Sequence, residues 1–134
     1  MNKGKKSIIT AESIETQKAP LPKGHYSQAV VHNGIVYVSG QLPIEPVSGK
    51  IVEGHIEAQA RQALENISAI LAEAGSGLNK VLKCNIYISN VEYWPAVNNI
   101  YAEFFGSHKP ARAIIPVNEL HHGCKIEIDA VAAK

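Results

Sequence analysis

The sequence lacks both a strong net charge and a long hydrophobic run. Among its 134 residues, Lys and Arg number 13 and Asp and Glu number 12, so the formal net charge is +1. This balance gives no electrostatic footprint for nucleic acid or for an anionic membrane surface. No apolar stretch approaches the roughly 20 residues that a membrane-spanning helix needs. Residues 1–7 are basic but lack the apolar segment of a secretory signal, so we expect a cytoplasmic protein without nucleic-acid or membrane partners.

Cysteines and familiar catalytic motifs are also scarce. Cys84 and Cys124 stand alone without CxxC spacing, which favours reduced thiols over a disulfide framework. No GxGxxG, P-loop, HExxH or GxSxG pattern is present. His121 and His122 lie close to Cys124, but no carboxylate or third histidine stands at ligand spacing, so we interpret them as a polar turn. We therefore predict no metal and no organic cofactor.

The overall amino-acid composition is that of an ordinary folded protein. Apolar residues make up 46% and charged residues 19% of the chain. The length suits one domain over residues 1–134, with residues 1–6 as a frayed, solvated start.

Hydrophobic periodicity predicts two helices, over residues 55–74 and 95–105, because apolar side chains recur at steps of three and four. Alternating or β-branched segments predict strands over residues 28–32, 35–39, 81–89, 113–117 and 124–131. Asn33-Gly34 predicts a tight hairpin turn. The strand at 35–39 is apolar on both faces, which predicts a central strand covered on both sides. Pro116 predicts an edge strand or a bulge.

The element order is roughly β-β-β-α-β-α-β-β. Two amphipathic helices and a sheet with one apolar face predict a two-layer α/β (α+β) sandwich, a mixed sheet covered on one face by two helices. The opposite face carries polar side chains such as Asn85, Tyr87, Lys125 and Glu127. That face is too mixed to form a core, and a subunit interface is one use for it.

Arg112 and Glu127 are the residues most suited to chemistry on a small carboxylate. A guanidinium can hold a carboxylate through two parallel hydrogen bonds. Glu127 could act as a base or hold a water molecule. Taken alone, however, each residue is more simply a surface ion-pair partner or a solvated strand carboxylate. The His25-Tyr26 pair is likewise either a candidate acid–base pair or part of a loop.

Six segments together favour the functional interpretation of these residues, because their order and spacing resemble the RidA (YjgF) family. The resemblance spans about residues 8–133, and its segments are 25–29 (HYSQA), 38–43 (VSGQLP), 59–67 (QARQALENI), 97–105 (VNNIYAEFF), 108–112 (HKPAR) and 125–130 (KIEIDA). It implies a sandwich of chorismate-mutase-like architecture and a homotrimer with ligand sites in the clefts between subunits. It also implies hydrolytic deamination of reactive 2-imino or enamine acids, such as 2-iminopropanoate and 2-iminobutanoate, to 2-keto acids and ammonia.

The resemblance further assigns roles to individual residues. Arg112 falls on the carboxylate-binding arginine, Glu127 on the glutamate associated with the attacking water, and Tyr26 on a site tyrosine. The remaining matches line the ligand: Ser39 and Gly40 in a loop, and Asn98 on the second helix. No metal or organic cofactor is implied.

Departures from the family pattern concern the substrate more than the fold. His25 replaces a common proline, and Ala113-Ile114 replaces the usual Ser/Thr-Cys pair. Ile114 therefore offers only a backbone N–H to a carboxylate, and its larger side chain is expected to alter substrate preference. Other functions stay open at this point: a non-catalytic binding or regulatory module for small carboxylates, an aminomuconate-type deaminase, and a ribonuclease or translation inhibitor.

Overall fold

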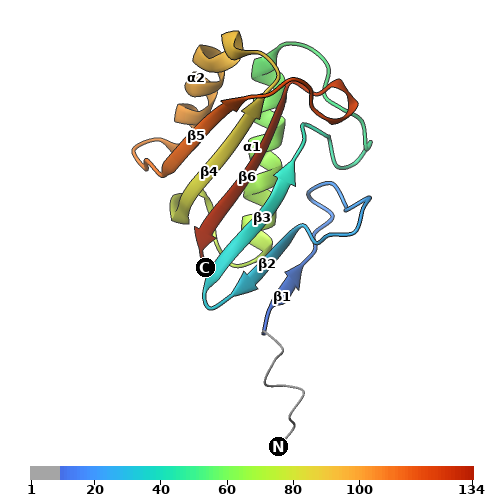
Figure 1. Cartoon of the computed structure of the whole chain (residues 1–134). Coiled ribbons are helices and arrows are strands. Elements are labelled where there is room, and N and C mark those ends of the chain that lie inside the picture. The colour runs from blue at the N-terminus through green and yellow to red at the C-terminus, as the bar shows by residue number, and fades with distance from the viewer. Residues whose placement is uncertain (1–9) are drawn as a thin grey trace, which may run out of the picture.

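The computed structural model describes residues 10–134, so the predicted frayed start at residues 1–6 lies outside the described part. Six strands and two α-helices follow in the predicted order (Figure 1). The elements are β1 (Glu12–Ile14), β2 (Ala29–His32), β3 (Ile35–Gln41), α1 (Ile56–Glu73), β4 (Val81–Ile88), α2 (Trp94–Phe105), β5 (Ala111–Pro116) and β6 (Ile126–Ala133). Short 3₁₀ turns η2 (Leu78–Lys80), η3 (Val91–Tyr93) and η4 (His121–Gly123) connect them.

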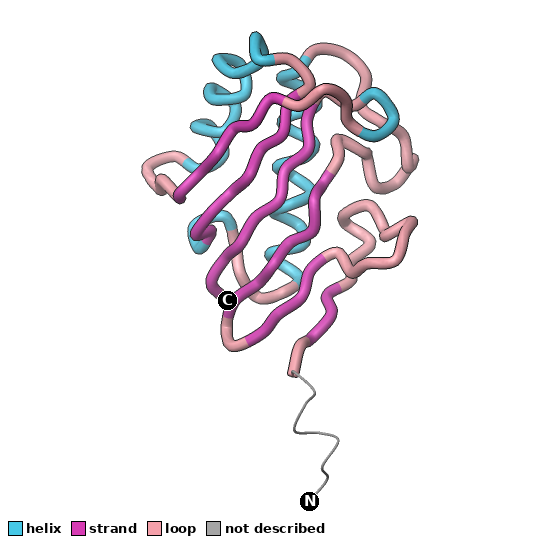
Figure 2. The backbone as a smooth tube through the Cα atoms, in the orientation of Figure 1, coloured by secondary structure: helices cyan, strands magenta, loops and turns pink. Residues whose placement is uncertain are grey.

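The strands form one mixed sheet in the order β1-β2-β3-β6-β4-β5. Only β4 and β5 pair in parallel, and helix α2 connects them, as a parallel crossover requires. Pro116 is the last residue of β5, which lies at the edge of the sheet, so the edge strand predicted from this proline is confirmed. Both helices lie behind the sheet in Figure 2, so the predicted two-layer arrangement is confirmed.

The core lies between the helices and one face of the sheet. Fully buried isoleucines of β4 and β6, at positions 86, 88, 126 and 128, meet the apolar stripe of α1. That stripe includes Leu64, Ile67, Ile70 and Leu71, which follow the predicted spacing. Gly75 ends the helix with a φ of 81°, a left-handed conformation that glycine adopts without steric cost. None of the described helices is long and apolar enough to cross a membrane.

The prediction that residues 35–39 are covered on both faces was wrong for the single chain. Strand β3 is indeed interior to the sheet, yet Tyr37 is 48% exposed. The reason is that both helices cover the other face. On the open face, Asp129 accepts hydrogen bonds from Asn85 Nδ2 at 3.0 Å and from the Tyr87 hydroxyl at 3.1 Å.

Two buried amides fix the loops at one end of the sheet. Gln28 accepts a hydrogen bond from the Thr16 N–H at 2.7 Å and donates to the carbonyls of Thr16 and Pro20 at 3.0 and 2.8 Å. Asn66 of α1 donates to the carbonyls of Leu42 and Ile44 at 3.1 and 3.0 Å. These bonds hold the segment before β2 and the loop after β3, which both reappear in the functional site.

Replacing Gln28 with Ala should lower the free energy of unfolding by about 2–4 kcal/mol, because it leaves several buried backbone groups without partners. Urea denaturation followed by circular dichroism measures this loss. Gln62→Ala is the matched control, since that half-buried amide bonds only the Asn66 side chain. An equal, small effect of both variants would contradict the role given to Gln28.

Candidate active site

Arg112 lies on the helix side of the sheet and is held by α2. In the sheet register it is the neighbour of the fully buried Cys84, so the two side chains share one face. Arg112 Nη1 donates to Asn98 Oδ1 at 2.9 Å. Its guanidinium carbon lies 4.9 Å from the ring centre of Tyr101 and 5.5 Å from that of Trp94, which are cation–π distances. Three side chains of one helix therefore orient this guanidinium.

Within residues 10–134, no carboxylate neutralises the charge of Arg112. The one ion pair in this part of the chain joins Arg61 and Glu103 at 2.8 Å. A guanidinium has five N–H donors, and Asn98 takes up one of them. A cleft of about 400 Å³ opens beside it, and its lining includes Asn98, Tyr101, His108, Lys109 and Arg112. Such a cleft can accept a carboxylate.

Glu127 lies on the opposite, open face of the sheet. Its neighbours Ile126 and Ile128 are fully buried against the helices, so the alternation of β6 turns Glu127 away from them. Burial raises the pKa of the Glu127 carboxyl, the charge of Asp129 raises it further, and His121 lowers it. A carboxyl group with a raised pKa is suited to exchanging protons near neutral pH.

The absence of a side chain at Gly40 leaves space for the Glu127 carboxylate. A methyl group on Gly40 would collide with Glu127 Oε2, so only glycine fits there without a shift. The pairing of β3 with β6 changes register between Val38 and Gln41, which is a bulge-like irregularity at this point. The close approach of the two strands here explains why Gly40 belongs beside the site.

Ser39 and Tyr26 join the same group. Ser39 Oγ donates to the Ser27 carbonyl at 2.6 Å, and its N–H donates to the Gln28 carbonyl at 2.9 Å. These bonds fasten the segment that carries Tyr26 to the end of β3. Tyr26 and Gly40 line the same cavity, and Tyr26 is 53% exposed.

The predicted site residues thus form two groups that one chain does not bring together. Arg112 pairs with Cys84, which pairs with Ala130, three residues beyond Glu127 on β6. The two groups are therefore separated by roughly 10 Å across the strands and roughly 10 Å along them. They also lie on opposite faces. No small molecule could contact Arg112 and Glu127 of the same chain.

Ile114 lies with the Arg112 group. It pairs with the buried Ile86 and packs partly against the core.

The two cysteines do not act as nucleophiles in this setting. Burial raises the pKa of the Cys84 thiol to about 11 and also raises the pKa of Cys124, so both stay protonated.

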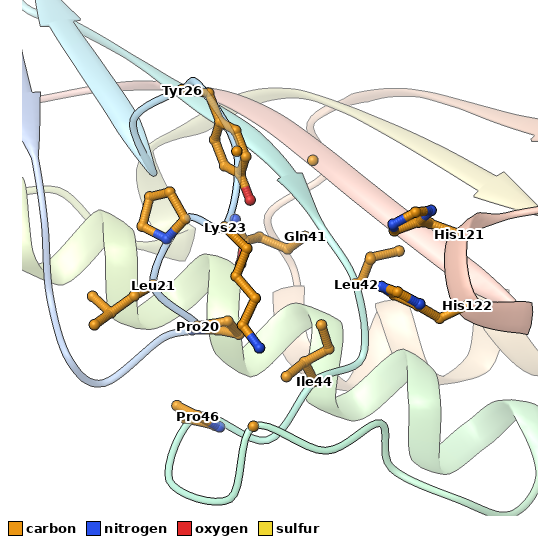
Figure 3. A pocket seen from close by; sticks show the side chains of 14 residues that line it. Pro20, Leu21, Lys23, Tyr26, Gln41, Leu42, Ile44, Pro46, His121 and His122 are labelled. Carbon is orange, nitrogen blue, oxygen red and sulfur yellow. The ribbon is translucent and has the colours of Figure 1, made fainter.

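A second cavity, of about 620 Å³, lies beside the Glu127 group (Figure 3). Three loops build its walls: the segment before β2, the loop after β3 and the turn η4. Lys23, His121 and His122 face it together with Tyr26. The sequence predicted the turn at His121-His122 correctly but gave no signal that it borders a cavity, because its partners are distant in the chain. No three His, Cys, Asp or Glu side chains of residues 10–134 gather as a metal site would require.

Glu127→Gln should stabilise the fold at pH 7, because the folded-state pKa of this carboxyl is raised. Such a group favours folding below its unfolded pKa, near 4.5, and this contribution is lost as the pH rises through the folded value. The gain in melting temperature should therefore grow from pH 4 to pH 8, as scanning calorimetry can measure. The exposed Glu119, changed to Gln, is the control. A gain that does not depend on pH would contradict the account.

Comparison with known proteins shows the family to which the chain belongs. The family model described as endoribonuclease L-PSP matches residues 16–134. The 2-iminobutanoate/2-iminopropanoate deaminase of Capra hircus is 40% identical over 128 residues, which cover 96% of this chain and 93% of that protein.

Solved structures share the fold. YyfA of Yersinia pestis, described as a protein of unknown function of the conserved Rid family, has a TM-score of 0.91 and 44% identity, covering 93% of this chain and 100% of that one. Escherichia coli TdcF, solved with bound serine, has a TM-score of 0.88 and 35% identity, covering 92% of this chain and 98% of that one. The chain therefore belongs to the RidA (YjgF) family, to which the endoribonuclease L-PSP family model corresponds.

Proposed function

We propose that the protein hydrolyses 2-imino acids to 2-keto acids and ammonia in sites formed between subunits of a homotrimer. One observation carries the proposal: a clamped guanidinium without a carboxylate partner and a carboxyl with a raised pKa lie on opposite faces of one sheet. Each is half of a site, and a neighbouring copy of the chain supplies the other half. The imine deaminases among its relatives and the serine bound to TdcF support a small substrate that carries a carboxylate beside the reacting carbon.

The chemistry follows from the two halves. Arg112 of one subunit holds the substrate carboxylate, which fixes the position of C2. Glu127 of the neighbour accepts a proton from water as the water oxygen bonds to C2 of the protonated imine. Glu127 then returns this proton to the amino nitrogen of the tetrahedral intermediate. The C–N bond breaks, ammonia leaves, and the hydroxyl oxygen gives its proton to the Glu127 carboxylate as the C=O bond forms. Tyr26 orients the water or the departing ammonia, and Ser39 and Gly40 line the ligand.

The open face of the sheet supports the subunit contact. It exposes Tyr37 and Ile115, two apolar side chains that are 48% and 37% exposed. It also carries the ordered polar network of Asn85, Tyr87 and Asp129. A rotational trimer can place this face of one subunit against the β5 edge of the next, which brings Arg112 and Glu127 to one cleft.

Removing either half should strongly reduce imine hydrolysis. Arg112→Ala should lower kcat/KM about a hundredfold or more, because the substrate carboxylate loses its charged partner. Glu127→Gln should lower it by about 10²–10⁴-fold. The assay generates 2-iminobutanoate with threonine dehydratase and traps the remaining imine with semicarbazide. Arg61→Ala, an exposed arginine between the two helices, is the control and should retain full activity.

The same assay separates a non-catalytic alternative. A carboxylate-binding module would need Arg112 but not Glu127. Its wild type would bind 2-oxobutanoate in calorimetry, lose binding on Arg112→Ala, and leave the semicarbazone signal unchanged. That outcome would reject the deaminase and keep only the binding role.

Mixing the two inactive variants tests the composite site. Arg112→Ala and Glu127→Gln chains, unfolded and refolded together in equal amounts, should regain about one quarter of the wild-type sites. Each variant refolded alone should remain inactive. Recovery occurs only if one subunit supplies the arginine and its neighbour the glutamate, so a mixture that stays inactive would contradict sites shared between subunits.

A further inference from the structure

We infer that the cavity beside Glu127 receives a second carboxylate, so that the preferred substrates are 2-imino acids with an acidic side chain. This inference rests on the proposed function and names the substrate class of the same site. It begins from the position of the cavity. Gly40 forms part of its wall and directly contacts the Glu127 carboxylate, and His121 both lines it and interacts electrostatically with Glu127. A side chain on the carbon attacked at Glu127 can therefore enter this cavity.

The size of the cavity exceeds the needs of a three- or four-carbon substrate. Its volume is about 620 Å³, within the range of pockets that enclose much larger ligands. Apolar walls from Pro20, Leu42 and Ile44 suit a short methylene chain. The cavity thus has room for substituents that 2-iminopropanoate lacks.

The hydrogen-bond donors of the walls suit an anionic end group. Lys23 faces the cavity from one side, and the rings of His121 and His122 face it from the other (Figure 3). No Asp or Glu lines it, and Lys23 has no carboxylate partner among residues 10–134. A carboxylate at the end of the substrate side chain would complete this arrangement with charge-assisted hydrogen bonds.

The backbone at His122 is a further sign of a built site. His122 has a φ of 58° and a ψ of 22°, a left-handed conformation that is uncommon outside glycine. Its ring lies against that of His121, with ring centres 3.8 Å apart. Strained conformations of this kind persist where the structure around them requires it, and they cluster at ligand sites. Two histidines without a third ligand are not a metal site.

Binding of the product keto acids tests the inference independently of catalysis. Calorimetry compares 2-oxoglutarate with its 5-methyl ester, which has the same open carbon chain but an uncharged end. The wild type should bind 2-oxoglutarate about tenfold more tightly. A double variant, Lys23→Gln with His122→Asn, should reduce this ratio to near one. Lys50→Gln, an exposed lysine outside the cavity, should leave the ratio unchanged.

Equal or weaker binding of 2-oxoglutarate, or no binding of either compound, would overturn the inference. So would tighter binding of an apolar analogue such as 4-methyl-2-oxopentanoate. Hydrolysis of 2-iminobutanoate in the trapping assay is scored separately. If the protein hydrolyses this imine but shows no preference for the acidic ligand, the proposed function stands and the inference fails. If the protein prefers the acidic ligand but does not hydrolyse the imine, the binding preference stands and the proposed deaminase activity fails.

Discussion

Successive side chains of a β-strand point to opposite faces of the sheet, and this alternation determines on which face each residue of the candidate site lies. Arg112 shares the helix side with Cys84, while Glu127 shares the open side with Tyr87. The helices cover only one face, so the polar open face is available for a second subunit. The separation that makes a single chain incomplete is thus the same feature that makes a shared site possible.

Several features around Glu127 place side chains at the candidate site but are unfavourable for the stability of the fold. A half-buried carboxyl with a raised pKa is unfavourable for folding at neutral pH, and a side chain at position 40 would collide with it. His122 holds a left-handed backbone next to the cavity. The buried amides of Gln28 and Asn66 hold the flanking loops through hydrogen bonds to the backbone. Natural active sites commonly show such a balance between stability and function.

Local periodicity predicted the ranges of both helices and of five of the six strands, because it depends on neighbouring residues. Strand β1 (Glu12–Ile14) received no range, since three residues are too few to show a period. The edge position of β5 followed from Pro116 in the same way. The exposure of Tyr37 was missed, since an apolar strand does not reveal whether its cover belongs to its own chain. The match of Arg112, Asn98 and Glu127 to the family came from the six segments, but their division between two faces required the register. The cavity around Lys23 and His122 depends on three distant loops, which no local pattern relates.

In the proposed mechanism, Arg112 and Glu127 of different subunits act on one substrate molecule. A crystal structure of the assembled protein with 2-oxobutanoate would show whether they meet. We expect the ligand carboxylate on the Arg112 guanidinium of one subunit and the ligand carbonyl carbon beside the Glu127 carboxylate of its neighbour. A ligand bound by Arg112 with no Glu127 carboxylate close to the carbonyl carbon would contradict it.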